Sequence, residues 1–98
     1  MKNKFVIIRT QSAGVHFGNL LKKEYTQAGT IVTLTNAQRV YYWSGAASLS
    51  QMANEGVKNP KECKFCQILP MIELSAIEII PTTIEAETNL KNVPIWQN

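Results

Sequence analysis

The stretch Lys4-Phe-Val-Ile-Ile-Arg-Thr10 decides the fold class, because it is almost continuously apolar and rich in β-branched residues. Such a run predicts a strand that is buried on both faces. Alternating side chains predict a second strand over residues 15–21, and β-branched residues predict a third over 30–35. Residues 38–43 resume the extended pattern after a bulge or brief break at residues 36–37. The first half is therefore predicted to be a β-meander.

Two short helices are predicted in the second half, each opened by a capping box. Ser48-Leu-Ser-Gln51 opens the first, which Gly56 ends in a left-handed conformation, and Thr82-Thr-Ile-Glu85 opens the second. Residues 65–69 and 72–80 are predicted as strands. We therefore expect an α+β fold, with a small antiparallel β-sheet or partly closed barrel of about five strands and two short helices.

The composition indicates one globular β-rich domain over residues 1–98, since the hydrophobic fraction is 45%. The net charge is only +3, and the ten Lys and Arg residues are dispersed along the chain. Binding to a nucleic-acid backbone is disfavoured, because it needs a concentrated basic surface. A mildly basic surface still suits a small anionic ligand. A domain of this size is commonly stabilised by oligomerisation, so we expect a homo-oligomer.

No membrane-directed segment is predicted. The apolar run at residues 5–8 is too short for a signal peptide, and no stretch approaches the roughly 18–20 apolar residues of a membrane span. We therefore expect a cytoplasmic protein without membrane contact, in which thiols stay reduced.

The motif Cys63-Lys-Phe-Cys66 is half of a zinc site or a redox pair in other contexts. Here it stands with no other cysteine and only one histidine, His16, and it precedes a predicted strand instead of opening a helix. His16 has no neighbouring nucleophile or orienting partner, and the carboxylates show no paired spacing. We therefore expect no metal, no cofactor and no catalytic residues, and so no enzyme.

The segment Arg39-Val-Tyr-Tyr-Trp-Ser-Gly-Ala-Ala-Ser48 combines a base-stacking surface with anion-binding groups. Tyr42 or Trp43 would stack on a base, and Arg39 would clamp an anion through two hydrogen bonds. The small residues allow a ligand to approach the N–H groups at the start of the helix. The predicted ligand-binding residues are Arg39, Tyr42, Trp43, Ser44, Gly45, Ser48, Arg9 and His16. The alternative is that the aromatics belong to the core and the glycine only permits a turn.

Three runs carry a resemblance to a known family: Val6-Ile-Ile-Arg-Thr-Gln-Ser-Ala-Gly-Val-His16, Asn36-Ala-Gln-Arg-Val-Tyr-Tyr-Trp-Ser-Gly-Ala-Ala-Ser-Leu-Ser-Gln51 and Ala76-Ile-Glu-Ile-Ile-Pro81. They resemble a family of small uncharacterised proteins found mainly in bacteriophages and prophages. Phage proteins of this kind are similar to counter-defence sponges, which are non-enzymatic oligomers that sequester nucleotide-derived immune signals. That similarity is an analogy of context.

The resemblance and the aromatic-basic segment together predict a function. We expect a non-catalytic phage accessory or counter-defence protein that binds and sequesters a nucleotide-derived signalling molecule in the cytoplasm of an infected bacterium. The alternative is a phage module that binds a host protein and has no small-molecule ligand.

Overall fold

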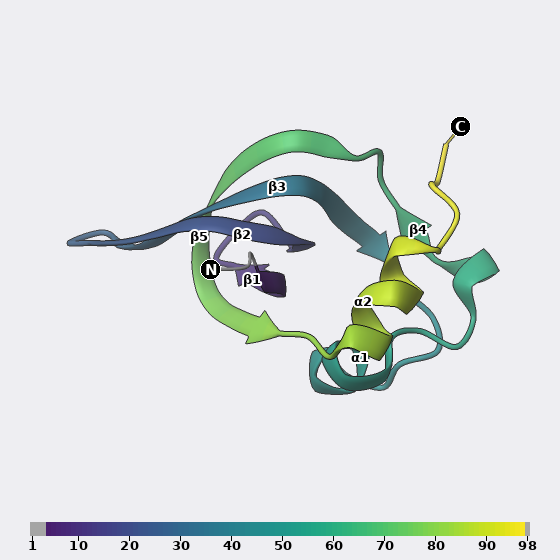
Figure 1. The fold of residues 1–98 in the computed structure, drawn as a ribbon. Coiled ribbons are helices and arrows are strands. Elements are labelled where there is room, and N and C mark those ends of the chain that lie inside the picture. Colours follow the sequence, from purple (N-terminus) through teal and green to yellow (C-terminus); the bar gives the residue numbers. More distant parts are fainter. Residues whose placement is uncertain (1–3, 98) are drawn as a thin grey trace.

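The computed structural model describes residues 4–97 as five strands, two α-helices and one 3₁₀ turn (Figure 1). In chain order these are β1 (Lys4–Thr10), β2 (Val15–Thr26), β3 (Gly29–Tyr42), α1 (Leu49–Glu55), η1 (Pro60–Glu62), β4 (Lys64–Phe65), β5 (Leu69–Pro81) and α2 (Ile84–Lys91). In this part of the chain no helix is both long enough and apolar enough to cross a membrane.

The strands form one antiparallel sheet in the order β2-β1-β5-β3-β4, and β2 also pairs with β3. Strands β1, β2, β3 and β5 therefore pair in a closed circuit, and β4 lies outside it. The far end of the β2–β3 hairpin extends from one side of the molecule, while both helices lie on the other side (Figure 1). The predicted α+β class, with five antiparallel strands and two short helices, is confirmed.

Strand β1 is continuously apolar from Phe5 to Ile8 because its two faces enter different cores. Phe5 and Ile7 belong to a cluster that also contains buried residues of both helices, which we call the helix-side core. Val6 and Ile8 belong to a second cluster whose buried members all come from strands, which we call the strand core. Each fully buried aliphatic or aromatic side chain contributes about 1.5–3 kcal/mol. A strand between two cores needs no polar alternation.

The hairpin strands differ from the prediction in length. Strand β2 continues to Thr26, so the β2–β3 turn is confined to residues 27–28, and β3 is one strand from Gly29 to Tyr42. The irregularity expected at residues 36–37 is present inside β3, where Asn36 has a φ of 49° and the β2–β3 register shifts opposite it. Asparagine tolerates this left-handed conformation better than most residues.

The predicted strand over residues 65–69 is largely wrong. Only Lys64 and Phe65 form β4, and β5 begins at Leu69. The amide of Cys66 still donates to the carbonyl of Arg39 on β3, but the carbonyl of Cys66 accepts from the side-chain amide of Gln38 at 2.9 Å, so backbone pairing ends at this residue. Residues 66–68 form a linker between β4 and β5.

Both helices begin with hydroxyl caps. The Oγ of Ser48 accepts from the Gln51 amide at 3.1 Å, and Gln51 Oε1 accepts from the Ala47 amide at 2.8 Å. The second helix starts one residue later than predicted, because Thr83 Oγ1 accepts from the Ala86 amide. The hydroxyl of Thr82 instead donates to the carbonyl of Phe5 at 2.9 Å, which attaches the start of α2 to β1.

Candidate functional site

A surface pocket of about 540 Å³ lies where β3, the β4–β5 linker and the C-terminal segment meet. It is lined by Arg39, Cys66, Gln67, Leu69, Trp96 and Gln97, and we call it the Arg39 pocket. Its volume falls within the roughly 300–1,000 Å³ that small-molecule sites occupy. Arg39 gives the pocket one fixed positive charge, and the Trp96 indole gives it a flat apolar surface. The side-chain amides of the two glutamines add neutral hydrogen-bonding groups.

The C-terminal segment is held in place by backbone contacts with β4. The amide of Trp96 donates to the carbonyl of Phe65 at 2.8 Å, and Ile95 forms a parallel bridge with Phe65. The indole of Trp96 stacks on Tyr41, with ring centroids 5.2 Å apart and an interplanar angle of 8°. Lys64 Nζ lies 5.5 Å from the Trp96 ring centroid and 5.8 Å from that of Tyr41. Tyr41 and Lys64 therefore flank the Trp96 ring, which itself lines the pocket.

Arg39 is held by His16. The two residues are direct partners across β2 and β3, and Arg39 Nε donates to His16 Nε2 at 3.2 Å. The His16 side chain is fully buried, and its Nδ1 has no hydrogen-bond partner among residues 4–97. Burial, and secondarily the charge of Arg39, lower the pKa of His16 from 6.5 to about 4. The imidazole is therefore neutral at physiological pH.

Tyr42 and Trp43 occupy different environments outside the Arg39 pocket. Tyr42 is exposed, whereas Trp43 is half-buried and packs against the helix-side core. Trp43 Nε1 donates to the carbonyl of Ala46 at 3.0 Å, so its polar atom is satisfied within its own loop. For Trp43 the geometry matches the alternative in which this aromatic side chain belongs to the core.

The small residues that follow are bonded to neighbouring loops. The amide of Ser44 donates to Cys63 Sγ at 3.3 Å, and its hydroxyl accepts from Asn59 Nδ2 at 3.0 Å. Gly45 has a φ of 97°, and a Cβ at this position would lie 2.4 Å from the Lys58 nitrogen. Glycine is therefore required here for the close approach of the 58–59 backbone. These bonds use the amide and hydroxyl of Ser44, and the Ser48 hydroxyl caps α1.

Arg9 lies on β1 opposite Glu78 of β5, and its Nε is 3.0 Å from Glu78 Oε1. It does not line the Arg39 pocket. Of the predicted site residues, the structure thus brings Arg39 and His16 together and leaves the rest elsewhere. Sequence reasoning missed Trp96 and Tyr41 as site residues. Tyr41 lies two positions beyond Arg39 on one strand, and that spacing could have indicated it.

Both cysteines are free thiols. Cys63 is buried and bonds Ser44, whereas Cys66 is half-buried and lines the Arg39 pocket. Within residues 4–97, no three His, Cys, Asp or Glu side chains come together in a group that could hold a metal ion.

The sequence of residues 3–90 matches a family described as a domain of unknown function, DUF6948. The chain belongs to this family. The expected resemblance is confirmed in one respect, which is that the chain belongs to a family of unknown function. The matched residues include His16, Arg39 and Cys66, and Trp96 lies beyond them. No curated protein and no solved structure matches the chain.

Proposed function

We propose that this DUF6948 chain is a non-catalytic protein that binds and sequesters a small nucleotide-derived anion. The observation that carries the proposal is that Arg39 and Trp96 line the same pocket. A guanidinium forms paired, charge-assisted hydrogen bonds to phosphate, and stacking on an aromatic side chain contributes about 1–3 kcal/mol per base. The pocket thus offers one group for each half of a nucleotide.

Preorganisation supports this assignment. Tyr41 stacks on the Trp96 ring, the carbonyl of Phe65 holds the Trp96 backbone, and His16 bonds Arg39. A site whose side chains are already ordered loses less conformational entropy when a ligand binds. The positive charge of Lys64 beside the two rings adds attraction for an anion.

Binding without catalysis is supported by the chemistry of the lining residues. None of the six is a carboxylate or a histidine, so the Cys66 thiol has no general base beside it in the lining. His16 lies beneath Arg39 and is fully buried, so it is not placed to exchange a proton with a ligand. In its full form, we propose a phage counter-defence protein that acts as a homo-oligomer in the cytoplasm of an infected bacterium. This setting rests on the resemblance of the Tyr-Trp-Ser-Gly-Ala segment to the bacteriophage and prophage family named above.

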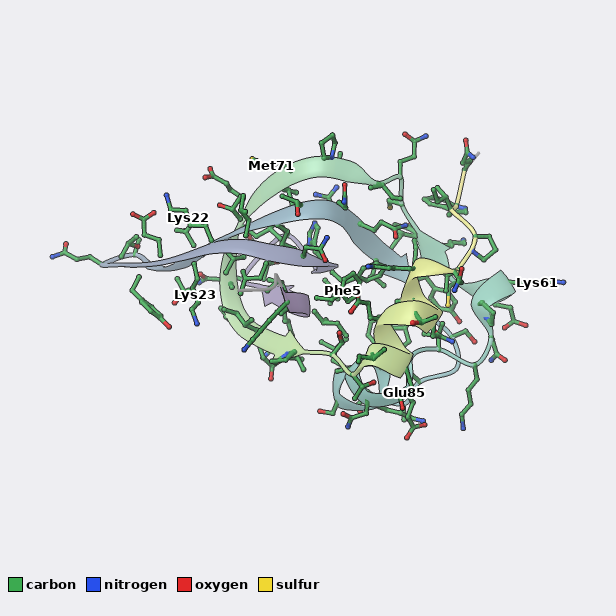
Figure 2. The ribbon with its side chains drawn as sticks, in the orientation of Figure 1. Phe5, Lys22, Lys23, Lys61, Met71 and Glu85 are labelled. Carbon is green, nitrogen blue, oxygen red and sulfur yellow. The ribbon has the colours of Figure 1, made fainter. Side chains whose placement is uncertain are left out.

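A second candidate is a module that binds a host protein. It is favoured by exposed apolar side chains on the linker and on β5, where Ile68 is 50% exposed and Met71 is 57% exposed. Figure 2 shows Met71 on the outer side of the β5 arc. Exposed apolar groups that lie near one another are typical of protein-binding surfaces.

A nucleic-acid interface has less support from the charge distribution. Lys22 and Lys23 lie on the projecting hairpin, and Lys61 lies at the opposite end of the molecule (Figure 2). Phosphate-backbone binding depends on several adjacent cations, whereas Lys61 lies far from the pair formed by Lys22 and Lys23.

Thermal-shift measurements would test the first candidate. The purified protein is mixed in turn with cyclic dinucleotides, cyclic trinucleotides, ADP-ribose derivatives and mononucleotides. Binding at a hundredfold excess over Kd adds about 2.7 kcal/mol of stability, which is a large shift in Tm for a domain of this size. We expect one ligand class to raise the Tm, and we expect Arg39→Ala and Trp96→Ala to abolish the rise.

Arg9→Ala is the matched control, because Arg9 is an exposed arginine outside the pocket. Its variant should retain the full ligand-induced shift. A rise that all three variants retain would place the ligand elsewhere. If no ligand class raises the Tm, the protein-binding module becomes the better candidate, and capture of host proteins on the immobilised chain is then the appropriate assay.

A further inference from the structure

The bond between Arg39 and His16 determines which donors Arg39 presents to the pocket. A guanidinium has one N–H on Nε and two on each terminal nitrogen. The single Nε–H is taken by His16 Nε2 at 3.2 Å. The Arg39 side chain makes no other hydrogen bond within residues 4–97, and the residue lines the pocket. The two terminal nitrogens are therefore the donors that remain for a ligand.

We propose that His16 is a positioning residue that orients Arg39 for end-on capture of a terminal oxyanion, either a phosphoryl or a carboxylate group. This inference rests on the proposed function, because it assigns the role of one half of the same site. Because His16 occupies the Nε–H group, a ligand cannot bind side-on, that is, through Nε and one terminal nitrogen together. Both terminal nitrogens can still donate in parallel to two oxygens of one group.

The placement of His16 suits this role better than direct ligand contact. Its side chain is fully buried, and its strand pairs with β1 on one side and β3 on the other. A side chain held on a paired strand is a more precise support than one on a loop. The buried imidazole therefore limits the directions that the Arg39 side chain can take.

The unpartnered Nδ1 supports the same role. Because Nε2 accepts the hydrogen bond from Arg39, the proton of the neutral ring is on Nδ1, which is buried without a partner among the described residues. An unsatisfied buried donor destabilises the folded state. Leucine would fill this position without that cost, but it could not accept from Arg39. The histidine is thus explained by its acceptor nitrogen and not by packing.

Three proteins separate positioning from structural support. His16→Leu removes the acceptor, His16→Gln replaces it with a side-chain carbonyl, and the wild type is the reference. The first measurement uses no ligand: the NMR signal of the Arg39 Nε–Hε pair reports the order of the guanidinium. We expect an ordered signal in the wild type and in His16→Gln, and a mobile one in His16→Leu. Equal mobility in all three proteins would overturn the proposal.

Inorganic phosphate and acetate are the binding probes, one for each source of the oxyanion. They are titrated while the Arg39 signals are observed. We expect phosphate, acetate or both to shift these signals. Their Kd should rise about tenfold in His16→Leu, as expected for the loss of roughly 1.4 kcal/mol, and recover in His16→Gln. The preferred probe identifies the group. Wild-type signals that neither anion shifts would overturn the proposal.

The outcomes also distinguish this inference from the proposed function. If oxyanions bind in the predicted manner but no nucleotide raises the Tm, the positioning role stands and the nucleotide assignment fails. If a nucleotide binds equally well to the wild type and His16→Leu, only the positioning role fails. Each variant is first compared with the wild type in Tm, and His16→Phe, which keeps a ring but has no acceptor nitrogen, replaces His16→Leu when that variant is poorly folded.

Discussion

Tyr41 and Trp96 stack with their rings 5.2 Å apart and nearly parallel, so the end of β3 holds the C-terminal segment against the Arg39 pocket. An aromatic pair of this kind contributes about 0.5–1.5 kcal/mol beyond its buried area. We expect Tyr41→Ala to lower stability by about 1 kcal/mol and to increase the solvent exposure of Trp96. Fluorescence of a Trp43→Phe background, in which Trp96 is the only indole, would show a red shift.

The neighbouring Tyr42 provides the control for this prediction. It is exposed, as is Tyr41, but it does not stack on Trp96. Tyr42→Ala in the same background should leave the Trp96 emission unchanged. An equal red shift in both variants would mean that the stack does not hold the C-terminal segment.

The lowered pKa of His16 predicts acid-sensitive stability. The unfolded chain takes up a proton below about pH 6.5, while the folded chain does so only near pH 4. The contribution of neutral His16 to the free energy of unfolding is therefore fully present above pH 6.5, and it is lost as the pH falls from 6.5 to about 4. Urea unfolding at pH 7.5 and pH 4.5 should show a His16-dependent loss on the order of 2 kcal/mol.

His16→Leu isolates this contribution, because it removes the imidazole and leaves every other side chain in place. The difference in unfolding free energy between wild type and variant should shift in favour of the variant as the pH is lowered. A pH-independent difference would show that the imidazole titrates normally in the folded chain.

Local signals in the sequence were sufficient for many of the elements. Strand β1 was predicted with its observed bounds, since a continuous apolar run depends only on its own residues. The start of α1 followed from the Ser48 cap, and its end from Gly56, which has a φ of 79°. These features rest on contacts between residues close in sequence.

The candidate site was harder to predict because its residues come from distant segments. The hairpin was predicted too short, which concealed the pairing of His16 with Arg39. The register shifts along β2 offset one another, so a plain count outward from the turn at residues 27–28 does place these two residues opposite each other. No comparable count leads to Trp96, because its position depends on the bridge between Ile95 and the two-residue strand β4.

Gly45 should be among the least replaceable residues of its loop. In Gly45→Ala the new methyl group would clash with the Lys58 backbone, and the alanine would also have to adopt the positive φ of this position, which it disfavours. Gly14 has a similar φ of 80° with nothing within 4 Å, so Gly14→Ala measures the backbone cost alone, about 1–2 kcal/mol. We expect Gly45→Ala to lose clearly more than Gly14→Ala in chemical unfolding. Equal losses of unfolding free energy would indicate that the 58–59 backbone moves away from residue 45 without cost.

Cys66 provides a chemical probe of the Arg39 pocket that is independent of stability. Its thiol is half-buried and lines the pocket, whereas that of Cys63 is buried and bonded to Ser44. A thiol reagent should therefore modify Cys66 first in the folded protein, and Cys66→Ser should remove this rapid reaction. A ligand that raises the Tm should slow the modification of Cys66 if it fills the pocket. Unchanged kinetics at saturating ligand would place the ligand elsewhere, even when the thermal shift is large.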